Sequence, residues 1–189
     1  LVISADASLP LIYLSGQTKE NPTTAPNFCM LLRKHIGNAR ILSVTQPDFE
    51  RIVEMELEHL DEMGDLCRKK LIVEIMGRHS NIILRASDGR IIDAARHVGQ
   101  DISRVRQVMP GLPYAYPPSQ GKLDPDTADS ASIAAALSAA GGKLDKAIGA
   151  SIAGFSPQAA REAAARMGLD GSSLVADIDV QQTSNALEA

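Results

Sequence analysis

Two apolar runs joined by a short polar link, at residues 71–84, constrain the fold more than any other stretch of this chain. The first run ends at Gly77, and the second ends at Leu84 after four polar residues. Two strands flanking a tight connection explain this pattern. The link presents Arg78 and His79 at its tip, and a structural turn has no need of that pair. We therefore expect molecular recognition near this link.

The same link has two other interpretations. In one, Ser80 and Asn81 satisfy the backbone of an ordinary polar turn. In the other, backbone N–H groups of the link form an anion-binding nest. The residues alone leave these alternatives open.

Residues 49–58 alternate between apolar and acidic side chains and predict a strand. One face carries Val53, Met55 and Leu57, with Arg51 at its end. The other face carries an acidic row that consists of Glu50, Glu54, Glu56 and Glu58. An unpaired buried cation is costly. Arg51 is therefore either a rim residue with its stem over the core or a guanidinium that holds a phosphate or a base.

The first part of the chain is expected to be an antiparallel β-rich domain with a packed helix, an α+β fold. Further strands are expected at residues 1–5, 11–14, 39–46, 68–76, 81–85 and 90–94. A helix is expected at residues 27–36 after Pro26, and a short one at 101–107. Four prolines and Gly111 within residues 108–118 predict an extended exit from the domain.

The pattern becomes helical after this exit, so we expect one domain at residues 1–116 and an all-α domain at residues 117–189. Helices are expected at 130–140, 144–153 and 157–167, and a fourth is expected after Ser172 or Ser173. Asp129 or Ser130 should cap the first of them.

The link Gly154-Phe-Ser-Pro157 between two of these helices resembles the turn of a helix-hairpin-helix unit. Backbone N–H groups at a helix start can hold a phosphate, so Gly154 and Ser156 are candidate phosphate contacts. Ser156 stands where such units place a second glycine, and it should cap the helix that begins at Pro157. The alternative is a helical hairpin that serves packing alone.

Composition excludes several classes of protein. The mean hydropathy is -0.05, and no apolar run approaches the ~18 residues of a membrane span. Cys29 and Cys67 lie far apart and show no metal-ligand spacing, so we expect a reduced cytoplasmic protein without a metal or other cofactor. The chain opens at Leu1 inside a strand-like run and stops without a helix cap, so we expect further sequence at both ends.

Charge is unevenly distributed. Residues 44–65 hold eight acids and one base, whereas residues 66–106 hold nine bases and four acids. One interpretation is a polarised surface whose basic part meets phosphates. The other is a set of strands with solvated charged faces.

Three segments resemble the N-terminal domain of the NFACT proteins, the family of bacterial RqcH proteins, with the older name fibronectin-binding protein A. They are residues 74–84, residues 27–36 and the exit at 108–114, in the same order as in that family. The resemblance implies a fold similar to the N-terminal part of formamidopyrimidine-DNA glycosylases.

The resemblance also implies a site and a function. The family's Asp-Arg pair falls on Glu50 and Arg51, and its Glu-Ile-Met run on Glu74, Ile75 and Met76. These residues, with Arg78 and His79, are expected to bind tRNA. Arg33 is a further candidate phosphate contact because the family's first helix contains it. The full protein would bind the large ribosomal subunit with a stalled peptidyl-tRNA and recruit alanyl-tRNA for alanine tailing of the nascent chain.

Catalysis is not expected. The four histidines show no ligand-type spacing, and the chain has neither a phosphate loop nor a nucleophile elbow. The catalytic N-terminal proline of the glycosylases is absent. Two alternatives remain open, namely a surface adhesin that binds fibronectin and a DNA-binding, repair-related protein without glycosylase activity.

Overall fold

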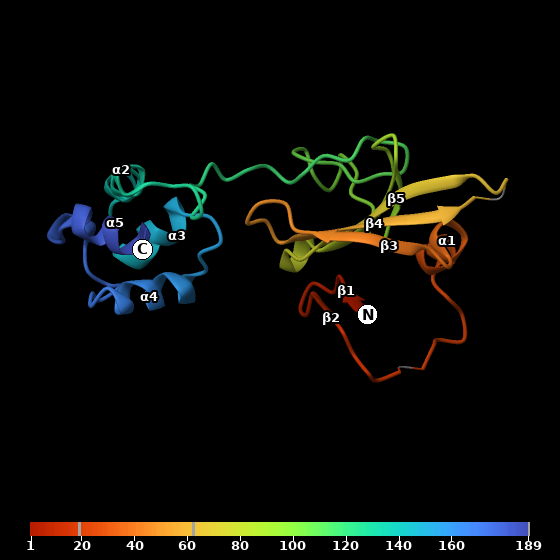
Figure 1. Cartoon of the computed structure of the whole chain (residues 1–189), viewed down its shortest axis with the longest axis horizontal. Helices are drawn as coiled ribbons and strands as arrows, with labels where there is room; N and C mark the ends of the chain where they lie inside the picture. Colours follow the sequence, from red (N-terminus) through yellow and green to blue (C-terminus); the bar gives the residue numbers. More distant parts are fainter. Residues whose placement is uncertain (19, 62, 189) are drawn as a thin grey trace. The chain divides into compact units, whose positions relative to one another are not determined.

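The structure is a computed structural model that describes residues 1–18, 20–61 and 63–188 (Figure 1). Lys19, Glu62 and Ala189, the last residue of the predicted helical domain, lie outside the described residues. The chain divides into two compact units. The first holds residues 1–47 and 51–117, and the second holds residues 48–50 and 118–189.

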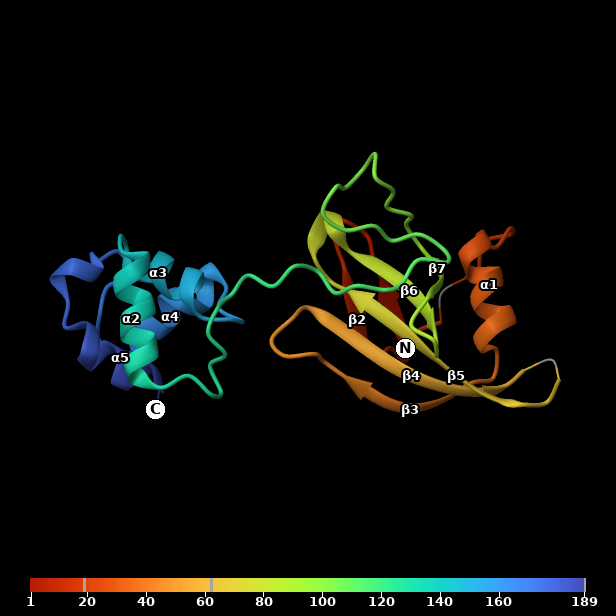
Figure 2. The same cartoon turned by 90° about the horizontal axis from the view of Figure 1, so that it is seen from above.

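The first unit is built on a five-stranded antiparallel sheet in the order β3-β4-β5-β6-β7 (Figure 2). Its strands are β3 (Arg40–Thr45), β4 (Ile52–Leu60), β5 (Leu66–Glu74), β6 (Asn81–Ala86) and β7 (Ile91–Ala94). A separate antiparallel pair is formed by β1 (Val2–Ser4) and β2 (Leu11–Tyr13). One helix, α1 (Asn27–Ile36), completes the unit. The expected antiparallel α+β architecture is therefore confirmed.

Both faces of the sheet carry an apolar cluster. The first cluster is made of Ile52, Ile72, Ile83, Ile91, Ala94 and Val108, with Val98 and Tyr114 packed against it. The second is made of Met55, Leu57, Leu71, Val73 and Leu84, covered by residues of β1, β2 and α1. Figure 1 shows β1 and β2 on one side of the sheet and the segment that follows β7 on the other.

The acidic row expected on β4 is not a solvated face. Glu54 is only 4% exposed, and it accepts hydrogen bonds from Lys70, with the ammonium 2.6 Å away, and from the hydroxyl of Tyr116. Farther along the same face, Glu58 pairs with Arg40 at 2.8 Å and with Arg68 at 3.5 Å. The acidic block thus pairs across the strands with part of the basic block, which explains why the two blocks follow each other in the sequence.

The segment after β7 has no α-helix among its residues 95–117, so the helix expected at 101–107 is wrong. The chain there forms turns and isolated bridges, including Val98 with Val108 and Arg90 with Pro113. The segment forms no helix because its backbone groups are bonded in these turns and bridges as it crosses one face of the sheet. Val108 is buried at that face.

The second unit contains four α-helices among the described residues. They are α2 (Ser130–Ala140), α3 (Leu144–Ser151), α4 (Pro157–Arg166) and α5 (Val180–Glu188). Asp129 caps α2 through the N–H of Ser132 at 2.7 Å, as expected. The fourth helix begins later than expected, because residues after Ser173 first form the short 3-10 helix η2 (Val175–Asp177). The side chain of Asp179 then accepts a hydrogen bond from the N–H of Gln182 in the first turn of α5.

Candidate functional site at one end of the sheet

Strand register brings several predicted residues to one end of the sheet. Ile52 at the start of β4 pairs with Glu74 at the end of β5, and Glu74 pairs with Asn81 at the start of β6. The pairing continues past the strands, because the N–H of Ile75 donates to the carbonyl of Arg51 at 2.8 Å. Residues that flank these strand ends therefore share one edge of the domain.

The link between β5 and β6 is a compact turn, the 3-10 helix η1 (Gly77–His79). Gly77 has a φ of 57°, a left-handed conformation that favours glycine. Ser80 is buried, and its hydroxyl accepts from the N–H of Met76 at 2.9 Å. The N–H groups of His79 and Ser80 bond to carbonyls of the same turn. Three N–H groups are thus used internally, which favours side chains over a backbone nest as the binding groups.

Arg78 and His79 are the exposed side chains of this turn. The Nε of Arg78 donates to Nε2 of His79 at 3.0 Å. The polar-turn interpretation therefore holds for the backbone of the link, and the binding role of its side chains stays a prediction. Ser80 and Asn81 complete the backbone from inside, while Arg78 and His79 face solvent.

Arg96, which belongs to no motif of the sequence, lies beside this turn. Asn81 is 3% exposed, and its side chain binds both the N–H of Arg96 at 3.0 Å and its carbonyl at 2.8 Å. The Nη1 of Arg96 donates to the carbonyl of Arg78 at 2.7 Å. The only sequence signal for Arg96 was its place in the basic block, two residues beyond a predicted strand.

Arg51 and Glu50 occupy different units. Arg51 is exposed at the start of the β4 region in the first unit, whereas Glu50 is half-buried and has its contacts in the second. Among the described residues, no ion pair joins an acid to Arg51, Arg78 or Arg96. These three guanidiniums, together with His79, are called the cationic end below.

Glu74 is the last residue of β5, shortly before the turn that carries Arg78, and it is 1% exposed. Its two carboxylate oxygens accept from Arg106 at 3.0 and 2.5 Å, and one also accepts from the hydroxyl of Tyr114 at 2.9 Å. Burial, followed by the nearby charge of Glu74, raises the pKa of Tyr114. Ile75 and Met76 are half-buried against the two apolar clusters. The Glu-Ile-Met run therefore supports the end of the sheet from within.

Arg33 is not brought to the cationic end. It lies on the exposed side of α1, where its Nη1 approaches the sulfur of Met30 at 3.8 Å. The last turn of α1 is fastened near the other end of the sheet, because Lys69 donates to the carbonyl of His35 at 3.3 Å. Arg33 thus belongs to a different surface of the unit from Arg51.

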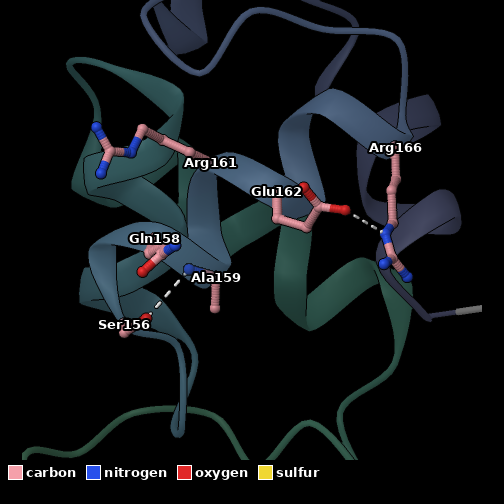
Figure 3. A pocket seen from close by; sticks show the side chains of 6 residues that line it. All are labelled: Ser156, Gln158, Ala159, Arg161, Glu162 and Arg166. Atoms are coloured by element: carbon pink, nitrogen blue, oxygen red, sulfur yellow. Dashed lines mark hydrogen bonds and ion pairs between the residues drawn. The ribbon is translucent and has the colours of Figure 1, made fainter.

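The predicted phosphate contacts of the second unit lie at the start of α4. The hydroxyl of Ser156 accepts from the N–H of Ala159 at 3.1 Å and so caps the helix. Gly154 has a φ of 78° in the link before it. A shallow hollow along α4 is lined by Ser156, Gln158, Ala159, Arg161, Glu162 and Arg166 (Figure 3). Glu162 pairs with Arg166 at 2.8 Å, which reduces the positive charge available there.

Within residues 1–18, 20–61 and 63–188, no group of three or more histidine, cysteine or acidic side chains is arranged to hold a metal ion. In the same ranges, no helix combines the length and the apolar character that a membrane crossing requires.

Residues 1–189 match the family described as NFACT N-terminal and middle domains. The chain belongs to the NFACT family. It is 42% identical over 170 residues to the Bacillus subtilis (strain 168) protein named Rqc2 homolog RqcH, which supports an NFACT N-terminal domain of RqcH type. That alignment covers 89% of this NFACT chain but 30% of the relative. The family resemblance expected from three short segments is confirmed.

Other relatives and solved structures agree with this family and fold. An archaeal relative from Methanocaldococcus jannaschii, named Archaeal Rqc2 homolog aRqcH, is 33% identical over 116 residues, 60% of this NFACT chain and 16% of the relative. The N-terminal part of the fibronectin/fibrinogen-binding protein of Streptococcus suis superposes with a TM-score of 0.78 at 32% identity, over 98% of this chain and 66% of that one. The fibrinogen binding protein of Staphylococcus aureus gives 0.80 at 27% identity, over 98% and 62%.

Proposed function

We propose that this NFACT chain is the tRNA-holding N-terminal part of an RqcH-like ribosome quality control factor. The whole factor would act in the cytoplasm on the large ribosomal subunit with a stalled peptidyl-tRNA. It would recruit alanyl-tRNA and so support alanine tailing of the nascent chain. Peptide transfer would belong to the ribosome, and this chain would contribute binding and no catalysis.

The contrast between the two ends of the sheet supports this proposal. Toward the hairpin that joins β4 and β5, cations are neutralised by acids, as Arg40 and Arg68 are by Glu58. At the opposite end, Arg51, Arg78 and Arg96 have no acidic partner among the described residues. Exposed guanidiniums without acids beside them are suited to nucleic-acid phosphates, and such contacts position the bound backbone.

In this proposal, buried groups at the end of β5 support the turn that carries the exposed side chains. Glu74 is fully engaged by Arg106 and Tyr114, so its role in the proposal is support and not direct contact with RNA. A binding group held by packed neighbours loses less entropy on binding. The same reasoning applies to Ile75 and Met76.

The deciding experiment measures binding of this chain to tRNA at two salt concentrations, for wild type, Arg51→Ala and Arg40→Ala. Arg40 is the matched control because it is an exposed arginine near the other end of the same sheet. Loss of a charge-assisted contact at Arg51 should cost about 1–3 kcal/mol and reduce the salt slope by about one. Arg40→Ala should bind as wild type does.

A second candidate function is binding of fibronectin or fibrinogen, which the names of the Streptococcus suis and Staphylococcus aureus structures favour. Parallel titrations with fibronectin and with duplex DNA at the same salt separate the candidates. A clear preference for tRNA that weakens in Arg51→Ala supports the proposal. Equal binding by Arg51→Ala and Arg40→Ala would contradict the tRNA site, and a preference for fibronectin or duplex DNA would favour those functions instead.

A further inference from the structure

Arg78 and Arg96 are exposed arginines on separate loops, and a hydrogen bond joins them directly. The Nη1 of Arg96 donates to the backbone carbonyl of Arg78 at 2.7 Å. The Nε of Arg78 is in turn directed at His79. One nitrogen of each guanidinium therefore already donates a hydrogen bond. The remaining N–H groups of the two guanidiniums have no hydrogen-bond partner among the described residues.

The loop that carries Arg96 is also fixed from beneath. The buried side chain of Asn81 bonds both backbone groups of Arg96, and the N–H of Ala95 donates to the carbonyl of Ile82 at 2.8 Å. These bonds satisfy the buried amide of Asn81 and hold the backbone of Arg96 beside the turn that carries Arg78. A ligand that must meet both guanidiniums would benefit from this fixed backbone.

The chemistry of the pair selects an anion with several acceptor oxygens. A guanidinium presents planar, paired N–H donors that match the oxygens of a phosphate. Among the described residues, no carboxylate forms an ion pair with Arg78 or Arg96. The nearest acid along the chain, Asp93, is paired with His97 at 2.6 Å.

We propose that Arg78 and Arg96 together form a two-arginine clamp for one backbone phosphate of the bound RNA, in addition to the contact at Arg51. The clamp rests on the proposed tRNA binding for the identity of its ligand. Its geometry comes from the bonds among Arg78, Asn81 and Arg96. The clamp reads the backbone and so adds affinity for RNA of any sequence.

The first test compares Arg96→Ala, Arg96→Lys and Arg40→Ala in tRNA titrations at several salt concentrations. Arg96→Ala should weaken binding about tenfold, in line with the loss of one charge-assisted contact, and reduce the salt slope by about one. Arg96→Lys should restore the slope but not the affinity, because lysine supplies the charge without the paired donors. Arg40→Ala should change neither.

Two outcomes of these titrations would overturn the clamp. One is binding by Arg96→Ala that equals binding by Arg40→Ala. The other is full recovery of affinity in Arg96→Lys, which would mean that only net charge matters there. In either case the proposed tRNA site at Arg51 would stand or fall on its own titration.

A second test does not depend on tRNA. Inorganic pyrophosphate is added to the wild-type chain while the arginine Nε–H signals are followed by NMR, with Arg78→Ala and Arg96→Ala used to assign them. The clamp predicts that the signals of Arg78 and Arg96 move together, and that the Arg78 response shrinks in Arg96→Ala. If neither signal moves, the clamp is wrong. If both move while tRNA does not bind, the clamp stands as an anion site and the proposed function fails.

Discussion

The carboxylate of Glu74 and the guanidinium of Arg106 form a two-point ion pair inside the first unit, with N–O distances of 3.0 and 2.5 Å. Arg106 also donates from Nε to the carbonyl of Ala115 at 2.6 Å and lies 5.1 Å from the ring centre of Tyr114. One arginine thus fastens the segment after β7 to the end of β5. The turn that carries Arg78 and His79 follows the end of β5 closely in the chain.

Arg106→Ala should strongly destabilise the first unit. Removing one partner of a buried pair leaves the other charge uncompensated and costs about 3–5 kcal/mol. Urea unfolding followed by tyrosine fluorescence measures this, because Tyr13, Tyr114 and Tyr116 all lie in the first unit. Arg40→Ala removes a side chain that is 75% exposed and leaves Arg68 beside Glu58, so it should cost less than about 1 kcal/mol. Equal losses in the two variants would show that the Glu74 pair is not a structural fastening.

Gly77→Ala should disturb the turn that displays Arg78. A side chain at a φ of 57° is strained, and the left-handed conformation costs about 1–2 kcal/mol for a residue other than glycine. Urea unfolding should report that loss, and tRNA affinity should fall because the turn shifts. The control is Gly16→Ala, where φ is not positive and an added Cβ meets nothing within 4 Å. A Gly77→Ala variant as stable as Gly16→Ala would contradict this account of the turn.

Glu54 should make the first unit sensitive to acid. Burial alone would raise the pKa of this carboxyl, but hydrogen bonds from Lys70 and Tyr116 and the charges of Lys70 and Arg85 together hold the pKa below the usual value of a glutamate. A carboxyl whose pKa is lower in the folded state stabilises the fold at pH values above its unfolded pKa. That contribution is lost as the pH falls through the folded pKa.

The measurement is the free energy of unfolding between neutral pH and pH ~3, in wild type and in Glu54→Gln. Wild type should lose stability once the pH falls below the ordinary range of a glutamate, about 4.3. The variant should lose less stability over the same pH interval, because glutamine does not take up a proton there. Parallel curves for the two proteins would exclude Glu54 as a source of the acid sensitivity.

Ser156→Ala should weaken the second unit through its helix cap. The serine hydroxyl accepts from the N–H of Ala159, and loss of such a cap costs about 1 kcal/mol. Thermal unfolding followed by circular dichroism measures the change. Ser138→Ala is the control, because Ser138 is exposed within α2 and alanine favours a helix there. If Ser156 only caps α4, tRNA affinity should be unchanged; a loss of affinity would revive its predicted phosphate contact.

Local patterns predicted most of the elements. The alternation at residues 49–58 and the two apolar runs at 71–84 became β4, β5 and β6, because a period of two leaves a chain few other ways to bury its apolar side chains. The helix ends also followed local rules, with Ser156 and Pro157 at the start of α4. The family resemblance rested on contiguous segments of the same kind.

Long-range pairing could not be predicted in this way. The sequence left open whether the charged strand faces are solvated; Glu54 on β4 is buried, and its carboxylate accepts a hydrogen bond from Tyr116, 62 residues away. The pattern at residues 101–107 predicted a helix, but this segment forms turns and crosses a face of the sheet. Arg106 gave no signal in the sequence, since an ion pair across 32 residues depends on where two loops meet.

The sequence by itself determined the family and most of the strands and helices, because each of these follows from the order of neighbouring residues. Only the tertiary structure decided which arginines pair with a carboxylate and which do not. It paired Glu58 with Arg40 and Glu74 with Arg106, and it left Arg51, Arg78 and Arg96 at one end of the sheet. The physical reason is that charge pairing acts between side chains brought within a few ångströms by strand register, and residues far apart in the chain set that register.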